Sequence, residues 1–241
     1  MTDQAVDILA FGAHPDDVEL GCGGTLLVHQ GKGKKTAIVD LTYGELGTRG
    51  TVELRKEEAA SAATILGVTA RENLGFSDGF FANDKEHQLE VVKMIRKYRP
   101  SIVLVNALHD RHPDHGRAAT LVTEASFLAG LEKVETELMK EAQQAFRPRA
   151  LYHYMQFIER VPDITVDISD CYEKKMEAVL AHRSQFYDPN SKESKTLISS
   201  KGFLQMIEAR ALASGMQIGV KYGEGFIASR SLGTNNLFGL I

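Results

Sequence analysis

Cysteine and long apolar runs are both scarce in this sequence. Only Cys22 and Cys171 occur in 241 residues, which is too few for a disulfide framework, and a reducing compartment would keep both as thiols. No apolar run approaches the roughly 20 residues that span a bilayer. The first residues also lack the basic start and the apolar stretch of a signal peptide. We therefore expect a cytoplasmic protein that has no membrane partner.

A strong charge of either sign is also missing. The formal net charge is −4, which gives the chain no general attraction to nucleic acid or to an anionic membrane. Hydrophobic residues make up 43% and charged residues 25% of the chain, as is typical of a soluble globular protein. Because these values argue against nucleic acid and lipid surfaces as partners, small-molecule chemistry is the better expectation.

Short apolar runs alternate with amphipathic segments in the first part of the chain. The continuous apolar run at 102–105 is typical of a strand that is covered on both faces, and a helical spacing of apolar residues elsewhere indicates helices with one buried face. This alternation implies parallel strands joined by right-handed crossovers. The predicted strands lie at 6–11, 36–41, around 73–74 and at 102–105, and the predicted helices lie at about 21–30, 59–66, 91–98 and 118–125.

The predicted fold class is therefore α/β, with a Rossmann-like, mostly parallel sheet that has helices on both faces. One domain over residues 1–241 is expected, because this length suits a single open α/β domain. Residues 1–130 would form its core, and an elaborated C-terminal part, 131–241, would shape the substrate pocket. In that part we predict strands at 151–154 and 164–168 and a helix at 172–181, whereas the Gly-rich stretch 215–225 has no firm assignment.

Two short motifs follow predicted strands. Residues 14–17 read His-Pro-Asp-Asp after the first strand, and residues 112–115 read His-Pro-Asp-His after the strand at 102–105. In an open parallel sheet, ligands bind beyond the carboxyl ends of the strands, near a switch in strand order. Both motifs occupy that kind of position, so we expect them to form one shared site.

The residue types of the two motifs are those of a catalytic metal site. Zinc in hydrolases commonly takes three protein ligands of imidazole or carboxylate type and leaves the next position open. His14, Asp17 and His115 would fill those three places, with one Zn²⁺ per subunit. Fe²⁺ or Co²⁺ would fit the same ligands.

The remaining motif residues could carry acid and base chemistry. Asp16 neighbours a ligand but leaves the loop in a different direction, so its carboxylate could take a proton from the attacking water and pass it to the leaving group. His112 could donate a hydrogen bond to the oxyanion that forms from a carbonyl. Asp114 could orient one of the histidines, although its position before a helix also suits an N-cap.

Other kinds of site use similar residues. Two histidines and a carboxylate describe the facial triad of non-heme iron oxygenases, and the glycines at 21–24 could cradle a phosphate at a helix N-terminus. However, three acidic residues lie where a pyrophosphate would sit, and the glycine spacing does not match a dinucleotide motif. A binding module without chemistry would have no use for Asp16. Hydrolysis therefore explains the motifs best.

With both motifs in place, the chain resembles the LmbE or PIG-L family of zinc-dependent N-acetylglucosamine deacetylases over roughly residues 5–130. It looks closest to the branch that deacetylates N-acetylglucosaminyl malate in bacillithiol biosynthesis. The resemblance implies that His14, Asp17 and His115 hold zinc. It also implies that Asp16 is the general base and that His112, supported by Asp114, stabilises the oxyanion or acts as an acid.

Substrate contacts are predicted with less support from the sequence. The resemblance implies that Arg55 contacts the sugar, although pairing with a nearby glutamate on an exposed helix would also explain an arginine there. Arg49 and Asp78 lie in loops after predicted strands and are candidate substrate contacts, as is Tyr222 in the Gly-rich stretch. The expected substrate is a small N-acetylglucosaminide, with chitooligosaccharide and inositol conjugates as alternatives to malate, and the family resemblance suggests a homo-oligomer.

Overall fold

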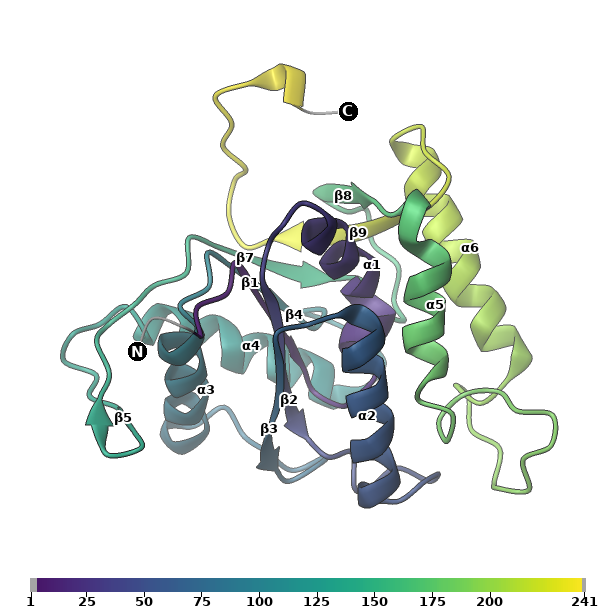
Figure 1. The fold of residues 1–241 in the computed structure, drawn as a ribbon, viewed down its shortest axis with the longest axis horizontal. Coiled ribbons are helices and arrows are strands. Elements are labelled where there is room, and N and C mark those ends of the chain that lie inside the picture. The colour runs from purple at the N-terminus through teal and green to yellow at the C-terminus, as the bar shows by residue number, and fades with distance from the viewer. Residues whose placement is uncertain (1–3, 240–241) are drawn as a thin grey trace.

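A seven-stranded sheet forms the centre of the computed structural model, which describes residues 4–239 (Figure 1). Its strand order is β3-β2-β1-β4-β7-β9-β8. Neighbouring strands from β3 to β7 are parallel, whereas β9 runs antiparallel to β7 and β8. The predicted mostly parallel sheet is therefore confirmed. The strands are β1 (Ile8–Gly12), β2 (Thr36–Thr42), β3 (Ala70–Phe76), β4 (Ile102–Val105), β7 (Ala150–Tyr154), β8 (Ile164–Asp167) and β9 (Gly223–Ala228).

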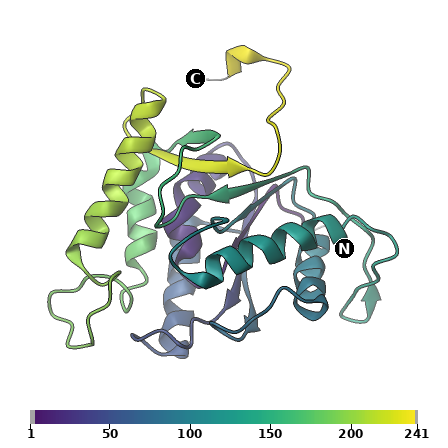
Figure 2. The same cartoon turned by 180° about the vertical axis from the view of Figure 1, so that it is seen from behind.

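Helices cover both faces of the sheet (Figures 1 and 2). Helices α3 and α4 pack together on one face, whereas α1, α2 and α5 share the other face and α6 packs on β9. Within residues 4–239, none of the helices combines the length and the apolar character that crossing a membrane requires. The helices are α1 (Asp17–Gly31), α2 (Val52–Leu66), α3 (Lys85–Tyr98), α4 (Pro113–Leu128), α5 (Tyr172–Leu180) and α6 (Lys201–Gln217). The short elements are β5 (Glu137–Leu138), β6 (Glu141–Ala142), η1 (Ser169–Cys171) and η2 (Leu237–Gly239).

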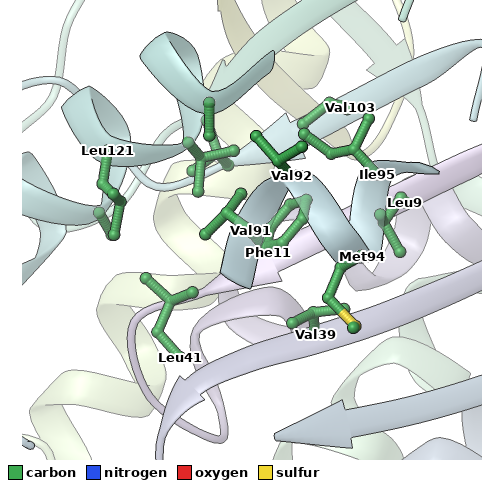
Figure 3. Packing of buried hydrophobic residues seen from close by; sticks show 14 of the residues in the cluster. Leu9, Phe11, Val39, Leu41, Val91, Val92, Met94, Ile95, Val103 and Leu121 are labelled. Carbon is green, nitrogen blue, oxygen red and sulfur yellow. The ribbon is translucent and has the colours of Figure 1, made fainter. Parts of the chain in front are cut away.

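Alternate residues of each central strand enter different apolar clusters. Leu9 and Phe11 of β1 pack with side chains of α3 and α4, as Figure 3 shows for Val91 and Leu121. Ile8, the neighbour of Leu9 in the strand, belongs instead to the cluster under α1 and α2. Since successive side chains of a strand point to opposite faces, burial on both faces requires the continuous apolar runs that the sequence contains.

The sheet has a switch point between β1 and β4. The chain leaves β1 through α1 to reach β2, and it leaves β4 through α4 to reach β7 on the other side of the sheet. The loops that follow β1 and β4 therefore diverge and leave a crevice beyond the carboxyl ends of the two strands. Residues 14–17 and 112–115 lie at the ends of these two loops and in the first turns of α1 and α4, and the two motifs meet there as predicted.

Helix α1 starts before the predicted position 21 and contains a break. Cys22 has a φ of −147°, which is not helical. Beyond the break, the carboxylate of Glu224 accepts hydrogen bonds from the backbone N–H groups of Gly24 (2.9 Å) and Thr25 (2.6 Å), which caps the second stretch of the helix. Apolar spacing predicted only this second stretch, because the acidic residues Asp17 and Glu19 interrupt it in the first.

The C-terminal part matches some of the predicted elements. Strands β7 and β8 and helix α5 confirm the predictions at 151–154, 164–168 and 172–181 within about a residue at each end. The sequence did not indicate α6 or β9. Their junction needs glycine, because a Cβ on Gly215 would lie 2.8 Å from the backbone of Lys221 and one on Gly223 would lie 3.0 Å from the backbone of Ser214. Close packing of α6 against β9 therefore explains Gly215 and Gly223.

Replacing Glu224 with glutamine tests the role of the buried carboxylate. Its Oε1 accepts a 2.6 Å hydrogen bond from Lys175 Nζ, and both side chains are only 3% exposed. Loss of one partner leaves a buried charge without its counter-ion, so Glu224→Gln should lower the free energy of unfolding by about 3–5 kcal/mol, as measured by urea denaturation. The control is Asp7→Asn, which breaks the exposed pair with Lys34 and should cost at most about 1 kcal/mol. Equal losses in the two variants would contradict this role.

Candidate active site

The two motifs form the floor of a cavity of about 390 Å³ beyond the carboxyl ends of β1 and β4. Side chains from the C-terminal part form another wall of the cavity, so the expected single site includes residues from both parts of the chain. Of the residues predicted from the sequence, those that line the cavity are His14, Asp16, Asp17, Arg55, Asp78, His112 and His115.

Asp17 lies between the other two predicted metal ligands. Its Oδ2 is 3.5 Å from His14 Nδ1, and its Oδ1 is 3.1 Å from His115 Nε2. Burial alone would raise the pKa of this carboxyl, but the charges and hydrogen bonds of His115 and His14 hold it well below its usual range. Asp17 is therefore an anion that faces one nitrogen of each imidazole.

Buried carboxylates hold the opposite nitrogen of each imidazole. His14 Nε2 lies 2.9 Å from Asp78 Oδ1 and 3.3 Å from Asp114 Oδ2, and His115 Nδ1 lies 2.5 Å from Asp110 Oδ2. Since carboxylates only accept hydrogen bonds, these nitrogens carry the protons. In the neutral histidines the lone pairs are then on His14 Nδ1 and His115 Nε2, the atoms that face Asp17. Asp114 supports His14, a question that the sequence left open.

These contacts fit a divalent cation. Burial opposes the charge on His115, yet Asp17 and Asp110 raise its pKa to about 9, and Asp114, Asp17 and Asp78 raise the pKa of the buried His14 well above its usual range. The surrounding carboxylates thus favour positive charge at this point, which a cation supplies when it replaces the protons. Imidazole ligands held by carboxylates are also the usual arrangement around protein-bound zinc.

In two groupings among residues 4–239 the ligand atoms all lie within 4.8 Å of one another, and neither grouping includes Asp17. His14 offers an atom within 4.8 Å of atoms of His112 and His115, and it also groups in this way with Asp78 and Asp114. The second grouping is explained by the hydrogen bonds to His14 Nε2. In the first, His112 Nδ1 accepts a 3.3 Å hydrogen bond from the backbone N–H of Asp114 at the start of α4.

That hydrogen bond also determines the tautomer of His112. Because Nδ1 is an acceptor, the proton of the neutral ring lies on Nε2, the nitrogen left free to donate. Burial and the neighbouring His14 and His115 lower the pKa of His112. The ring is therefore a neutral hydrogen-bond donor on the cavity floor.

Asp16 has an unusual backbone conformation. Its φ of 114° lies in the region that favours glycine, so the surrounding structure must hold the residue there against local strain. Its Oδ2 lies 3.7 Å from a guanidinium nitrogen of Arg55. Burial raises the pKa of the carboxyl to about 6, and Arg55 opposes this rise. Asp16 is thus a buried carboxylate close to the pH range in which a base can exchange protons.

Arg55 is buried and does not pair with a glutamate on the helix surface. Its guanidinium donates to the backbone oxygens of Gly44 (2.9 Å) and Pro15 (2.8 Å), whereas Glu58 accepts hydrogen bonds from the backbone and hydroxyl of Ser184. The surface pairing that could have explained the arginine is therefore wrong. Arg55 lines the cavity beside Asp16.

Three predicted substrate contacts have other partners. Arg49 and Tyr222 do not line the cavity: Arg49 donates to Ser191 Oγ (2.8 Å), and the ring of Tyr222 stacks on a neighbouring tyrosine with centroids 3.9 Å apart. Asp78 does line it, but one oxygen meets His14 and the other accepts a 3.0 Å bond from Leu46 N. The structure thus brings Asp78 to the site as a partner of the imidazole.

Several site residues were not identified from the sequence. Asn106 and Gln156 donate to the two oxygens of Asp17 at 3.0 Å and 2.9 Å, and Asn106 also accepts a 2.9 Å bond from Ala13 N. Asp110, which contacts His115, was also not identified from the sequence. Asn106 directly follows the strand at 102–105, a position that could have marked it, but no local pattern indicates Gln156, which follows β7.

The fold and the site together define an α/β enzyme with a candidate metal centre at the switch point of its sheet. Residues 9–126 match the family described as PIG-L, GlcNAc-PI de-N-acetylase. The chain is 35% identical over 189 residues to diacetylchitobiose deacetylase of Thermococcus kodakarensis, a match that covers 74% of this chain and 70% of that protein. The chain therefore belongs to the PIG-L family of hydrolytic N-deacetylases, and the prediction of an N-deacetylase is confirmed.

Other relatives differ in their described activity. A probable N-acetyl-alpha-D-glucosaminyl L-malate deacetylase of Bacillus cereus is 26% identical over 74% of this chain and 83% of that protein. A 4-oxalmesaconate hydratase of Pseudomonas putida is 28% identical over 71% and 70%. A conserved protein of Thermus thermophilus has the same fold, with a TM-score of 0.84 and 38% identity over 95% of this chain and 98% of that chain. Sequence identity thus does not single out the malate branch.

Asp110→Asn tests whether the outer carboxylate supports the metal site. The substitution removes the charge that holds His115 Nδ1 but keeps the side-chain size. Loss of such a partner typically costs 10–100-fold in metal affinity, so we expect a drop of about that size in zinc affinity, measured by competition with a chromogenic chelator. The control is Asp170→Asn, which changes an exposed carboxylate outside the cavity. An affinity equal to that of the wild type would rule out this role for Asp110.

Proposed function

We propose that this protein is a zinc-dependent deacetylase that hydrolyses the acetamide of an N-acetylglucosaminide. One observation carries the proposal. His14 Nδ1 and His115 Nε2 both face the Asp17 carboxylate, while buried carboxylates hold the other nitrogen of each ring. This arrangement suits a cation, and Asp16 and His112 lie beside it, where we assign them to catalysis. When bound, such a cation polarises an amide carbonyl and lowers the pKa of a water molecule.

Asp16 is the proposed base. Its raised pKa, due to burial and opposed by Arg55, keeps the carboxylate basic enough to accept a proton from the water that attacks the acetyl carbon. The same group can then give that proton to the nitrogen as the C–N bond breaks, because the leaving group must depart as an amine. Acetate and the free glucosamine derivative are the products.

His112 is the proposed oxyanion donor. The backbone N–H of Asp114 binds its Nδ1, so Nε2–H is available to the negative charge that develops on the acetyl oxygen. A donor that is already in place costs no reorganisation during the reaction, and removal of one such donor typically costs 10²–10³-fold in kcat. Arg55, which is buried beside Asp16, is proposed to contact the sugar.

N-acetylglucosaminyl malate is the proposed substrate, with chitobiose and inositol conjugates as alternatives. The resemblance in the motifs and the malate deacetylase of Bacillus cereus support malate, whereas the higher identity to diacetylchitobiose deacetylase supports a second sugar in its place. A panel of these N-acetylglucosaminides, compared by kcat/KM for acetate release, distinguishes them. The predictions of a cytoplasmic location and of a homo-oligomer belong to the same proposal.

Hydration of a carbon–carbon double bond is a second candidate function, because the similar protein of Pseudomonas putida is described as a hydratase. Asp16 and His112 could activate water for addition just as they could for hydrolysis. The two reactions differ in their products, since only deacetylation releases acetate. Loss of ultraviolet absorbance from 4-oxalmesaconate without acetate release from any N-acetylglucosaminide would favour the hydratase. Oxygen consumption that depends on iron would instead indicate the facial-triad oxygenase.

Asp16→Asn should separate catalysis from metal binding. The amide cannot accept a proton, so kcat for acetate release should fall by about 10²-fold or more, while zinc content per protein, measured by elemental analysis, stays near that of the wild type. Near-normal activity would reject Asp16 as the base. Loss of zinc would show instead that Asp16 is needed to hold the metal.

Arg55→Gln should change the pH dependence. A base works in its deprotonated form, so activity rises as pH increases through the pKa of Asp16. Burial raises this pKa and Arg55 lowers it, so removal of the guanidinium should move the acidic limb of kcat/KM to higher pH. Lys56→Gln, which changes an exposed neighbour in α2, should leave the limb in place. An unmoved limb in Arg55→Gln would contradict the link between the two side chains.

A further inference from the structure

Arg210 brings a positive charge from the C-terminal part to the cavity. It lies on α6, is half-buried and lines the cavity. Its guanidinium donates to the backbone oxygens of Gln156 and of Leu20, the latter at 3.2 Å. Two backbone contacts hold the group in place, and a guanidinium has five N–H donors, so donors remain for a ligand.

No carboxylate of the described residues pairs directly with Arg210. Arg55, Arg71 and Arg117 each have a carboxylate oxygen within 4.0 Å, whereas Arg210 has none in the part of the chain that the structure describes. Burial lowers the pKa of its guanidinium, and the charges of Glu224, Asp110 and Glu159 oppose this without forming an ion pair with it. Arg210 is thus a partly dehydrated cation without a counter-ion, an arrangement that costs free energy in the free protein.

The position of Arg210 indicates which part of a substrate it can meet. The proposed function assigns the motifs on the cavity floor to the acetamide and Arg55 to the sugar, which leaves the wall formed by α6 for the group attached to the sugar. That wall includes the apolar side chains of Phe203 and Met206 of α6 together with Arg210. Apolar surroundings strengthen the attraction between opposite charges.

We propose that Arg210 binds a carboxylate of the group attached to the sugar, so that the enzyme selects an acidic aglycone. The inference rests on the proposed deacetylase function and makes the substrate class specific: a glucosaminide with a carboxylate-bearing substituent rather than a neutral second sugar. The planar guanidinium matches a carboxylate through two parallel N–H donors. Binding would give Arg210 the counter-ion that the chain does not supply.

A matched pair of substrates tests the assignment. N-acetyl-alpha-D-glucosaminyl L-malate and its dimethyl ester have the same skeleton but differ in charge. The wild-type enzyme should favour the diacid by at least tenfold in kcat/KM for acetate release, through a lower KM. Equal values for the two substrates in the wild type would overturn the proposal without any variant.

The variants Arg210→Gln and Arg210→Lys test the residue itself. Glutamine should remove the preference by raising KM for the diacid about tenfold or more, with kcat and the ester reaction changed less than threefold, and lysine should keep part of the preference. The control, Lys201→Gln, removes an exposed charge of the same helix and should behave as the wild type. If Arg210→Gln slows both substrates equally, the side chain only supports Gln156 and Leu20, and the proposal is wrong.

The test also separates this proposal from the assigned reaction. Calorimetry in the slow Asp16→Asn background measures binding of the diacid and the ester to protein with arginine or lysine at position 210. Stronger binding of the diacid that weakens in the variant supports Arg210 even if no acetate appears, in which case the deacetylase assignment alone fails. If acetate is released from both substrates and both bind equally well, the deacetylase assignment stands and only the role of Arg210 is contradicted.

Discussion

The contact of Asp17 with two histidines is the interaction on which the rest of the site depends. Its carboxylate, at the start of α1, faces His14, three residues earlier in the chain, and His115, in the first turn of α4. Asn106 and Gln156 bind the same carboxylate. Three separate strand ends therefore converge on one anion. Such a concentration of buried polar groups is stable only if each has a partner, and the hydrogen bonds of Asp78, Asp110 and Asp114 provide those partners.

Reactivity and stability compete in the loop after β1. Asp16 has a backbone conformation that suits glycine, and its carboxyl is buried, which raises its pKa to about 6. A relaxed, exposed aspartate would cost the fold less but would be a much weaker base. Arg55 holds the loop through Pro15 O and limits the rise in pKa. One arginine thus maintains the geometry and adjusts the charge of the proposed base.

This chain is similar to proteins described as a chitobiose deacetylase, a malate deacetylase and a hydratase. The structure suggests how such diversity arises. The motifs and their carboxylate partners up to Asp114 belong to the core, whereas Phe203, Met206 and Arg210 come from α6 in the C-terminal part. Changes in α6 can alter what binds next to the acetamide without disturbing the residues around Asp17. Specificity can therefore vary while the reactive centre is retained, since function resides in sites carried by a fold.

The sequence by itself determined the parallel α/β core and the meeting of the motifs, because these follow from local signals: apolar runs, helical spacing and polar residues directly after strand ends. It could not determine which side chains form hydrogen bonds with each other. The partner of His14 is Asp78, 64 residues away, and the support of Asp17 includes Gln156, 139 residues away. Glu224 caps α1 beyond its break, and Arg49 and Tyr222 contact partners outside the cavity that no local pattern indicates. Only the tertiary structure decided these pairings, because hydrogen bonds and burial depend on distance in space rather than along the chain.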